Sequence, residues 1–438
     1  MEWNQLLSDR RFGKEYVAKS AAERRTEFQR DYDRLIFSAA FRRMQNKTQV
    51  FPLPGSVFVH NRLTHSLEVS SVGRSLGADV AALLQQRDSA AGERTPEALG
   101  AIVSAACLAH DMGNPPFGHS GERAIRSFFA EGQGREWEKM LPKSVWADIV
   151  NFDGNANTFR LLTHQFNGHR AGGFVMTYAT LAAIVKYPFA SDCCRGKSKF
   201  GFFQSEAADF RRIADELGLP NCAASDESLR FVRHPLVYLV EAADDICYQI
   251  MDLEDAHKLR LLSDEQAEAL LLDFFAPEER KRLRSAYPMV TDANGRMVYY
   301  RSSIINALER ACVNIFVDNE AAILAGTFEG SLISPLPEPL LGAYQRCAAL
   351  AKEKIYRSKE VMDVDLAGYH IIYTLLELMT EAVLAPQKAY SQMLLGMASK
   401  QYELRAERLE VRLMAVLDYL SGMTDVYALD LYRKISGQ

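Results

Sequence analysis

The stretch AIVSAACLAHDMGNPPFGHSGE (101–122) joins an apolar helix to a tight polar loop and the start of a second helix. Residues 100–111 are almost continuously apolar, end at His110-Asp111, and are followed by GNPP, a strong helix stop. An ionised aspartate at the carboxyl end of a helix opposes the helix dipole, which favours cations there. A bound divalent cation would remove that conflict. Imidazole with carboxylate suits Mn²⁺, Fe²⁺, Co²⁺ or Ni²⁺, with Mg²⁺ as a further option.

Two other segments offer ligands of the same type. His65 lies in HNRLTHSLEV, and Asp244 and Asp245 lie in EAADDICY. Both segments repeat apolar residues at helical spacing, so three separate helices could present a His, a His-Asp pair and an Asp to one ion. Helical bundles build metal sites in this way, from side chains on facing helices.

The GHSGE segment supplies a second chemical pair. His119 and Glu122 are three residues apart, just after the loop and near a helix start at Ser120. This spacing points both side chains the same way and places them near free backbone N–H groups, which favour anions. A histidine that titrates near neutral pH suits proton transfer.

Helical periodicity dominates the rest of the chain, and strand signals are few. The pattern VTDANGRMVYY, with Asn-Gly between apolar runs, predicts a hairpin at 290–300, and 50–59 is a second candidate. The fold class is therefore mainly α, with one or two small hairpins. Helices are expected at 62–85, 100–111, 235–259, 300–325, 340–357, 366–385 and 402–421.

Composition limits the classes of function. The net charge is −5, so nothing pulls the whole chain toward nucleic acid, and a polyanionic ligand needs a local basic pocket. The seven cysteines are irregularly spaced and include no CxxC pair, which indicates reduced thiols of a cytoplasmic protein. No stretch of 18 uncharged apolar residues occurs, and we expect no membrane insertion.

The order His, His-Asp, Asp resembles the HD phosphohydrolase superfamily. Within it, the longer strings resemble the bacterial deoxyguanosine triphosphate triphosphohydrolases. The long string LAHDMGNPPFGHSGE is the most specific, and the last 150 residues match less clearly. The matching strings are FRRMQNKTQVFPL (41–53), RLTHSLEVSSVGR (62–74), LAHDMGNPPFGHSGE (108–122), IVKYP (184–188), KFGFFQSE (199–206) and YLVEAADDICYQIMDLEDA (238–256).

The resemblance implies one mostly helical domain over 1–438, with an HD catalytic core at about 30–260 and a helical C-terminal extension at about 261–438. It also implies a divalent metal (Mg²⁺, Mn²⁺ or similar), a proton relay and a substrate pocket. The implied metal ligands are His65, His110, Asp111 and Asp244, and the implied catalytic pair is His119 and Glu122.

The implied substrate contacts follow the parts of a deoxynucleotide. Tyr248 would lie against the deoxyribose and exclude a 2′-hydroxyl, while Asp252 and Gln49 would contact the sugar. Asp365, in a loosely matching KEVMDVDLAGYH segment, is the best candidate to read guanine. The implied triphosphate-binding residues are Arg62, Lys186, Tyr187 and Lys199.

The expected reaction is metal-dependent hydrolysis of dGTP, and of other dNTPs as an option, to deoxynucleoside and tripolyphosphate. Residue types alone leave the cleaved bond open, and the resemblance decides it. Two alternatives stay open: another HD-type nucleotide phosphohydrolase, and a non-catalytic module that senses nucleotides or single-stranded DNA. The family also implies a homo-oligomer, with a hexamer as one form, and an effector that is a dNTP or single-stranded DNA.

Overall fold

The computed structural model describes residues 1–14, 24–51, 58–87, 95–194, 198–223, 229–286 and 292–437. Almost all regular structure in these ranges is helical, and the β contacts among them are isolated bridges. The mainly α fold class is confirmed. None of the described helices combines the length and the apolar composition needed to cross a bilayer.

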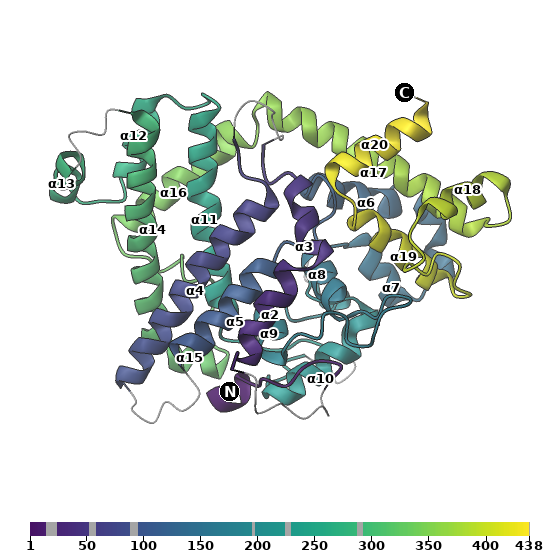
Figure 1. The fold of residues 1–438 in the computed structure, drawn as a ribbon, viewed down its shortest axis with the longest axis horizontal. Coiled ribbons are helices and arrows are strands. Elements are labelled where there is room, and N and C mark those ends of the chain that lie inside the picture. Colours follow the sequence, from purple (N-terminus) through teal and green to yellow (C-terminus); the bar gives the residue numbers. More distant parts are fainter. Residues whose placement is uncertain are drawn as a thin grey trace.

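Three long or apolar helices form the centre of the molecule: α4 (Arg62–Arg87), α5 (Pro96–Ala109) and α11 (Val237–Lys258). Figure 1 shows α4 and α5 side by side, with α2 (Glu27–Ile36) and α9 (Tyr178–Ile184) against α5. The α4–α5 contact is close because Gly77 lies on the backbone of Leu99, where a Cβ would stand 2.8 Å from the carbonyl oxygen.

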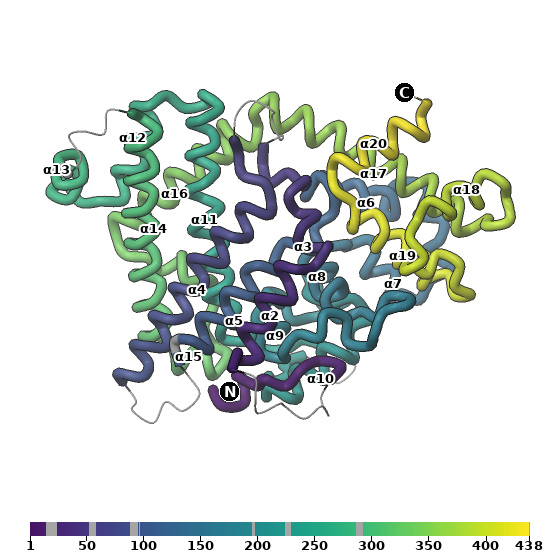
Figure 2. Tube along the Cα trace, in the orientation of Figure 1, coloured from purple at the N-terminus to yellow at the C-terminus, as the bar shows by residue number. Residues whose placement is uncertain are grey.

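The other helices surround this centre. Figure 2 follows the chain from the purple N-terminal segment to the yellow C-terminal helices, which lie beside α17 and α6. The bounds are α1 (Trp3–Leu6), α3 (Ala39–Arg43), α6 (His119–Ala130), α7 (Lys143–Val150), α8 (Gly154–Thr163), α10 (Ala207–Leu217), α12 (Asp264–Leu272), α13 (Pro277–Ala286), α14 (Ala293–Asp318), α15 (Glu320–Ala325), α16 (Leu340–Leu350), α17 (Lys359–Leu384), α18 (Ala389–Met397), α19 (Leu409–Ser421) and α20 (Asp425–Ser436). Short 3₁₀ segments span Met44–Asn46, Gln133–Met140, Ser191–Cys193 and Gln204–Glu206, and a π turn spans Ala351–Ile355.

Two apolar cores hold these helices together. The larger core lies among α2, α4, α5, α9, α11 and α14. The second lies among α6, α7, α17, α19 and α20, and joins residues 124–203 to residues 371–431. The loop after α5 lies between the two cores because α5 belongs to the first and α6 to the second. The division into a catalytic core and an extension at about residue 260 stays a prediction.

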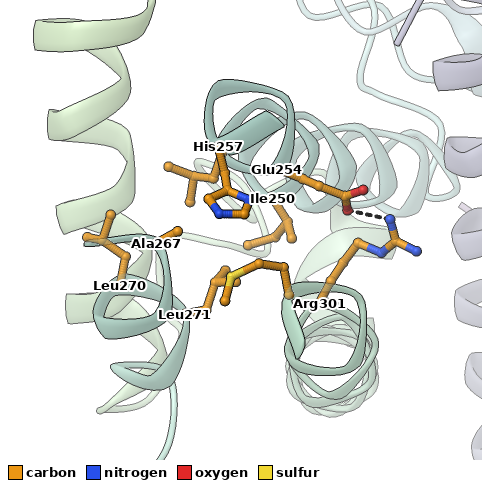
Figure 3. Close-up of a pocket in the computed structure, with 9 residues that line it drawn as sticks. Ile250, Glu254, His257, Ala267, Leu270, Leu271 and Arg301 are labelled. Atoms are coloured by element: carbon orange, nitrogen blue, oxygen red, sulfur yellow. Dashed lines mark hydrogen bonds and ion pairs between the residues drawn. The ribbon is translucent and has the colours of Figure 1, made fainter. Parts of the chain in front are cut away.

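Helix α11 is fixed at its carboxyl end by α12 and α14. Figure 3 shows Glu254 of α11 paired with Arg301 of α14, beside Ile250 and the leucines of α12. The ion pair lies at the edge of an apolar contact, so the charged groups stay paired while Leu270 and Leu271 pack inward. This contact orients the helix that carries Asp244.

The hairpin predicted at 290–300 is wrong, because α14 begins at Ala293. The side chain of Asp292 accepts a hydrogen bond from the backbone N–H of Gly295 at 2.7 Å, so Asn294-Gly295 forms the first helical turn. The hairpin predicted at 50–59 falls mostly on 52–57, outside the described residues. The helix predicted at 402–421 begins only at Leu409; residues 402–408 form turns that bury Leu404 in the second core.

Candidate active site and metal centre

Three helices bring the expected ligand side chains together. His65 comes from α4, His110 caps α5 with Asp111 next to it, and Asp244 comes from α11. One ligand atom each from His65, His110 and Asp111 lies within 4.8 Å of the others. Oδ1 of Asp244 lies 3.1 Å from Nε2 of His65 and 3.5 Å from Nε2 of His110. The four side chains that the chain order His, His-Asp, Asp singled out therefore lie close together in the structure.

The donor set fits a divalent ion. Nδ1 of His110 donates to the Cys107 carbonyl at 2.6 Å, which directs Nε2 toward the carboxylates. That Nε2 atom is buried and has no hydrogen-bond partner. Burial lowers the pKa of His110, but the charges of Asp111 and Asp244 outweigh it and raise the pKa to about 9. The two carboxylates thus favour a positive charge at Nε2 of His110. A metal ion bound there would take the place of the proton.

Polar neighbours hold Asp111 in place. Arg62 donates to its Oδ2, and the side-chain amide of Asn114 donates to its Oδ1 at 2.5 Å. Burial raises the pKa of Asp111, but Arg62 and the two histidines outweigh it and keep the pKa below its usual value. Gly118 makes room for Arg62, since a Cβ on this residue would overlap the guanidinium.

The loop that begins α6 has unusual backbone geometry. Phe117 and Gly118 both have positive φ, at 59° and 52°, so the chain turns sharply before His119 starts the helix. Asp425, from α20, fixes this turn: its carboxylate accepts the N–H of Phe117 at 2.9 Å and that of Thr48 at 2.7 Å. The turn is therefore held by the last helix of the chain.

His119 and Glu122 form the expected pair. The distance from Nδ1 of His119 to Oε2 of Glu122 is 3.0 Å, and Oε1 of Glu122 accepts the N–H of Gly154 at 2.8 Å. The imidazole is 77% exposed, whereas the carboxylate is 2% exposed. Burial raises the pKa of Glu122, but the bonds to His119, the charge of Lys199 and the Gly154 N–H lower it to about 2. An ionised, buried carboxylate thus orients an accessible imidazole.

These groups line one open cavity of about 620 Å³, within the usual size range of small-molecule sites. Gln49 also lines it, and its side-chain oxygen is buried without a partner. His65 and Asp252 lie behind the wall. The predicted site residues on the wall are Gln49, Arg62, His110, Asp111, His119, Glu122, Lys186, Tyr187, Lys199, Asp244, Tyr248 and Asp365.

Two lysine side chains on the cavity wall each pair with a nearby carboxylate. Lys186 pairs with Glu241 at 3.0 Å, and Lys199 pairs with Asp153 at 3.1 Å. Burial lowers the pKa of Lys199, but Asp153 and Glu122 outweigh it and raise the pKa, so the ammonium stays charged. A phosphate ligand would replace these carboxylates as the partner of each lysine.

A tyrosine pair closes the side of the cavity formed by α11. The rings of Tyr248 and Tyr356 are stacked with centroids 5.9 Å apart, and the Tyr356 hydroxyl donates to Asp252 at 2.7 Å. Burial raises the pKa of Asp252 to about 8, although the bond from Tyr356 opposes this. Asp252 lies one turn after Tyr248 on α11. It therefore contacts the cavity only through the hydroxyl of Tyr356. Asp365 lies elsewhere on the wall, where its carboxylate accepts from Arg123 at 2.7 Å.

Sequence reasoning missed Tyr356 and Asp425. Neither lies in a recognisable motif, and each acts on a residue at least 100 positions away. Asn114 was inside the quoted string but had no role assigned. His164 and His169 line a different cavity. The side-chain amide of Asn157 donates to the Gly113 carbonyl from behind the loop.

Two known domain families match parts of this chain. Residues 62–151 match the HD domain, and residues 337–434 match the phosphohydrolase-associated domain. A deoxyguanosinetriphosphate triphosphohydrolase-like protein of Pseudomonas aeruginosa strain LESB58 is 39% identical, over all of this chain and 99% of that protein. A protein of the same name from Synechocystis is 37% identical over 100% of this chain and 99% of its own length.

A Yersinia enterocolitica protein named deoxyguanosinetriphosphate triphosphohydrolase is 30% identical, over 99% of each chain. The similarity to these relatives runs through both matched domains and over full length. The chain therefore belongs to the HD-domain family of deoxyguanosinetriphosphate triphosphohydrolase-like proteins and is an HD-type phosphohydrolase.

Proposed function

We propose that the protein hydrolyses deoxynucleoside triphosphates, with dGTP preferred, to deoxynucleoside and tripolyphosphate. The observation that carries the proposal is one nucleotide-sized cavity that joins the His-Asp cluster, the His119–Glu122 pair and three cationic side chains. The preference for dGTP rests on the names of the relatives. The three cationic side chains proposed to bind phosphate are Arg62, Lys186 and Lys199; a fourth, Arg123, also lines the cavity and pairs with Asp365.

In this proposal His65, His110, Asp111 and Asp244 hold a divalent ion such as Mg²⁺ or Mn²⁺. Bound there, the ion polarises the α-phosphate and lowers the pKa of a water. Arg62 and Asn114 keep Asp111 in the orientation that metal binding needs, because each donates a hydrogen bond to one of its two carboxylate oxygens.

The lysines neutralise the triphosphate. Lys186 and Lys199 exchange their carboxylate partners for phosphate oxygens when substrate enters, and Arg62 can fork onto a phosphate near the cluster. These charges stabilise the transition state because negative charge builds on the phosphoryl oxygens.

The bond that breaks joins the α-phosphorus to the 5′-oxygen. The oxygen of water forms the new bond to phosphorus, and the departing 5′-oxygen takes a proton. In this proposal His119 gives that proton from Nε2; the contact of its Nδ1 with Glu122, which leaves Nε2 facing away, supports this role. An alkoxide is a poorer leaving group than triphosphate, so cleavage at this bond needs such help.

The sugar and base contact other residues of the same cavity. Tyr248 stands against the deoxyribose, where a 2′-hydroxyl would collide with its ring, and the Tyr356–Asp252 pair supports it. Gln49 contacts the sugar with its unpartnered oxygen. Asp365 accepts from guanine N1–H and N2 after exchange with Arg123.

The wider setting is also part of the proposal. The enzyme is cytoplasmic, works as a homo-oligomer for which a hexamer is one candidate, and responds to a dNTP or single-stranded DNA as effector. The seven cysteines are all free, which suits a reducing compartment.

The test is product analysis with purified protein. Each dNTP and GTP is incubated with Mg²⁺ or Mn²⁺, and ion-exchange chromatography separates the products, with Asp111→Ala protein alongside. Deoxyguanosine and intact tripolyphosphate from dGTP, with none from the variant, is the expected result. Release of phosphate or pyrophosphate would place the protein among other HD phosphohydrolases. No cleavage with any metal or nucleotide mixture would refute the proposal.

A further inference from the structure

Two lysines on the wall of the candidate active-site cavity have carboxylate partners that differ in what else they contact. Lys186 pairs with Glu241 at 3.0 Å, and Lys199 pairs with Asp153 at 3.1 Å. Arg233 also pairs with Glu241, at 3.2 Å, so this carboxylate keeps a cation when its lysine moves to a phosphate. In the part of the chain that the structure describes, no second cation pairs with Asp153.

The carboxylate of Asp153 is fully buried at the start of α8. Its Oδ1 accepts the backbone N–H and the side-chain amide of Asn155, at 2.8 and 2.7 Å. Its Oδ2 is buried and, apart from the ion pair with Lys199, has no partner among the described residues. The charge of Oδ2 is therefore compensated by one movable side chain.

A second buried carboxylate, Glu122, lies close to Asp153. Its Oε1 accepts the N–H of Gly154, the residue that follows Asp153, at 2.8 Å. Its Oε2 lies 3.0 Å from Nδ1 of His119 and 3.9 Å from Nη1 of Arg126. Glu122 therefore keeps partners of its own wherever the lysine goes, whereas Asp153 does not.

The charges around Asp153 favour its neutral form once Lys199 is absent. Burial and the charge of Glu122 raise the pKa of Asp153, whereas Lys199 lowers it. Cys194 is a further titratable group close by, but burial raises the pKa of its thiol to about 11, so it brings no positive charge. A buried carboxylate without a cation is costly, and the group avoids that cost by taking a proton.

We propose that Asp153 takes up one proton from solution when Lys199 leaves it for a phosphate group of the ligand. The proton passes from a buffer acid to Oδ2, where an O–H bond forms, and Lys199 stays charged throughout. Asp153 is thus a positioning residue that holds the lysine in the free protein. The inference rests on the proposed function, because it takes Lys199 as a triphosphate-binding residue.

The test is isothermal titration calorimetry of the purified protein with tripolyphosphate, a product that the proposed reaction does not cleave. Titrations at neutral pH in two buffers of different ionisation enthalpy count the protons exchanged for each ligand bound. Wild type is expected to take up about one proton more than Asp153→Asn. Asparagine caps a helix as well as aspartate does, so the variant keeps the start of α8.

Glu241→Gln is the matched control, because it removes the carboxylate partner of the other lysine in the same cavity. Glu241 keeps Arg233 in wild type and needs no proton, so this variant is expected to give the wild-type proton count. Lys199→Gln is expected to weaken tripolyphosphate at least about tenfold, since it loses a charged phosphate contact. The same counts are expected in EDTA, because neither Asp153 nor Lys199 belongs to the metal cluster.

Equal proton counts in wild type and Asp153→Asn would overturn the inference and leave the triphosphate site in place. An equal loss of uptake in Glu241→Gln would also overturn it, because the proton would then not belong to Asp153. So would loss of binding in Asp153→Asn, since Lys199 should bind phosphate without its competitor. No binding to wild type, or undiminished binding to Lys199→Gln, would refute the phosphate-binding role of Lys199 as well. Product analysis measures bond cleavage and therefore tests the proposed hydrolysis separately.

Discussion

Replacing Gly118 by alanine perturbs the loop between α5 and α6 at one defined point. Gly118 has φ 52° and ψ −123°, a backbone conformation that residues other than glycine rarely adopt. Forcing alanine into such a region costs about 1–3 kcal/mol. The new Cβ also overlaps the guanidinium of Arg62, which then leaves Asp111. A hydrogen bond to a charged group is worth about 1.5–3 kcal/mol.

These terms together predict that Gly118→Ala lowers the free energy of unfolding by about 3 kcal/mol. At a denaturant dependence of about 3 kcal/mol per molar, the urea midpoint falls by about 1 M. The assay is urea unfolding followed by circular dichroism, in EDTA so that metal binding does not contribute.

The matched control is Gly396→Ala. Gly396 lies in α18, is exposed, and has no atom within 4 Å of an added Cβ. Alanine there is expected to stabilise the protein by about 0.5–1 kcal/mol because glycine is a poor helix former. The two substitutions thus have opposite signs. A Gly118→Ala protein as stable as wild type would refute the strain and the Arg62 contact together.

Three further outcomes are expected. Glu122→Gln is expected to lower kcat by about 10²- to 10⁴-fold in steady-state kinetics while metal content stays constant, since in the proposed mechanism Glu122 orients the proton donor without touching the cluster. An unchanged kcat would remove Glu122 from the proposed proton relay. Tyr248→Ala raises kcat/KM for GTP relative to dGTP by about tenfold or more, and an unchanged ratio would mean that the ring does not read the sugar. His60 governs alkaline stability: burial lowers its pKa, but carboxylates including Asp255 outweigh this and raise it to about 10. The pKa of His60 is about 6.5 in the unfolded chain, so its contribution is complete below pH 6.5 and is lost as pH rises to about 10. Urea unfolding is therefore expected to separate wild type from His60→Gln by about 2 kcal/mol at pH 6 and by much less at pH 10; a constant gap would contradict the ion pair.

Local sequence predicted what local interactions decide. The GNPP stop, the His-Asp pair before it and the i, i+3 spacing of His119 and Glu122 each lie within one short segment, and the structure places them as expected. The Asn294-Gly295 hairpin failed for the same kind of reason, because an aspartate cap two residues earlier competes with the turn.

Contacts between distant segments could not be predicted in this way. Tyr356 reaches Asp252 across 104 positions, and nothing in either neighbourhood specifies the pairing. The cavity lined by His164 and His169 combines residues 34 to 43 with residues 401 to 422, which become neighbours only when the two apolar cores assemble. Periodicity predicts which face of a helix is apolar, but not which other helix will cover it.

The contact of Asp425 with Phe117 and Thr48 has a consequence for biosynthesis. At roughly 5–20 residues per second, translation of 438 residues takes roughly 20 to 90 s. The proposed metal ligands His65, His110 and Asp111 are synthesised in the first third of that time, more than 300 residues before Asp425, the carboxylate that fixes their loop. A nascent chain thus carries these side chains without the finished turn, and the turn can form only after residue 425 has been synthesised.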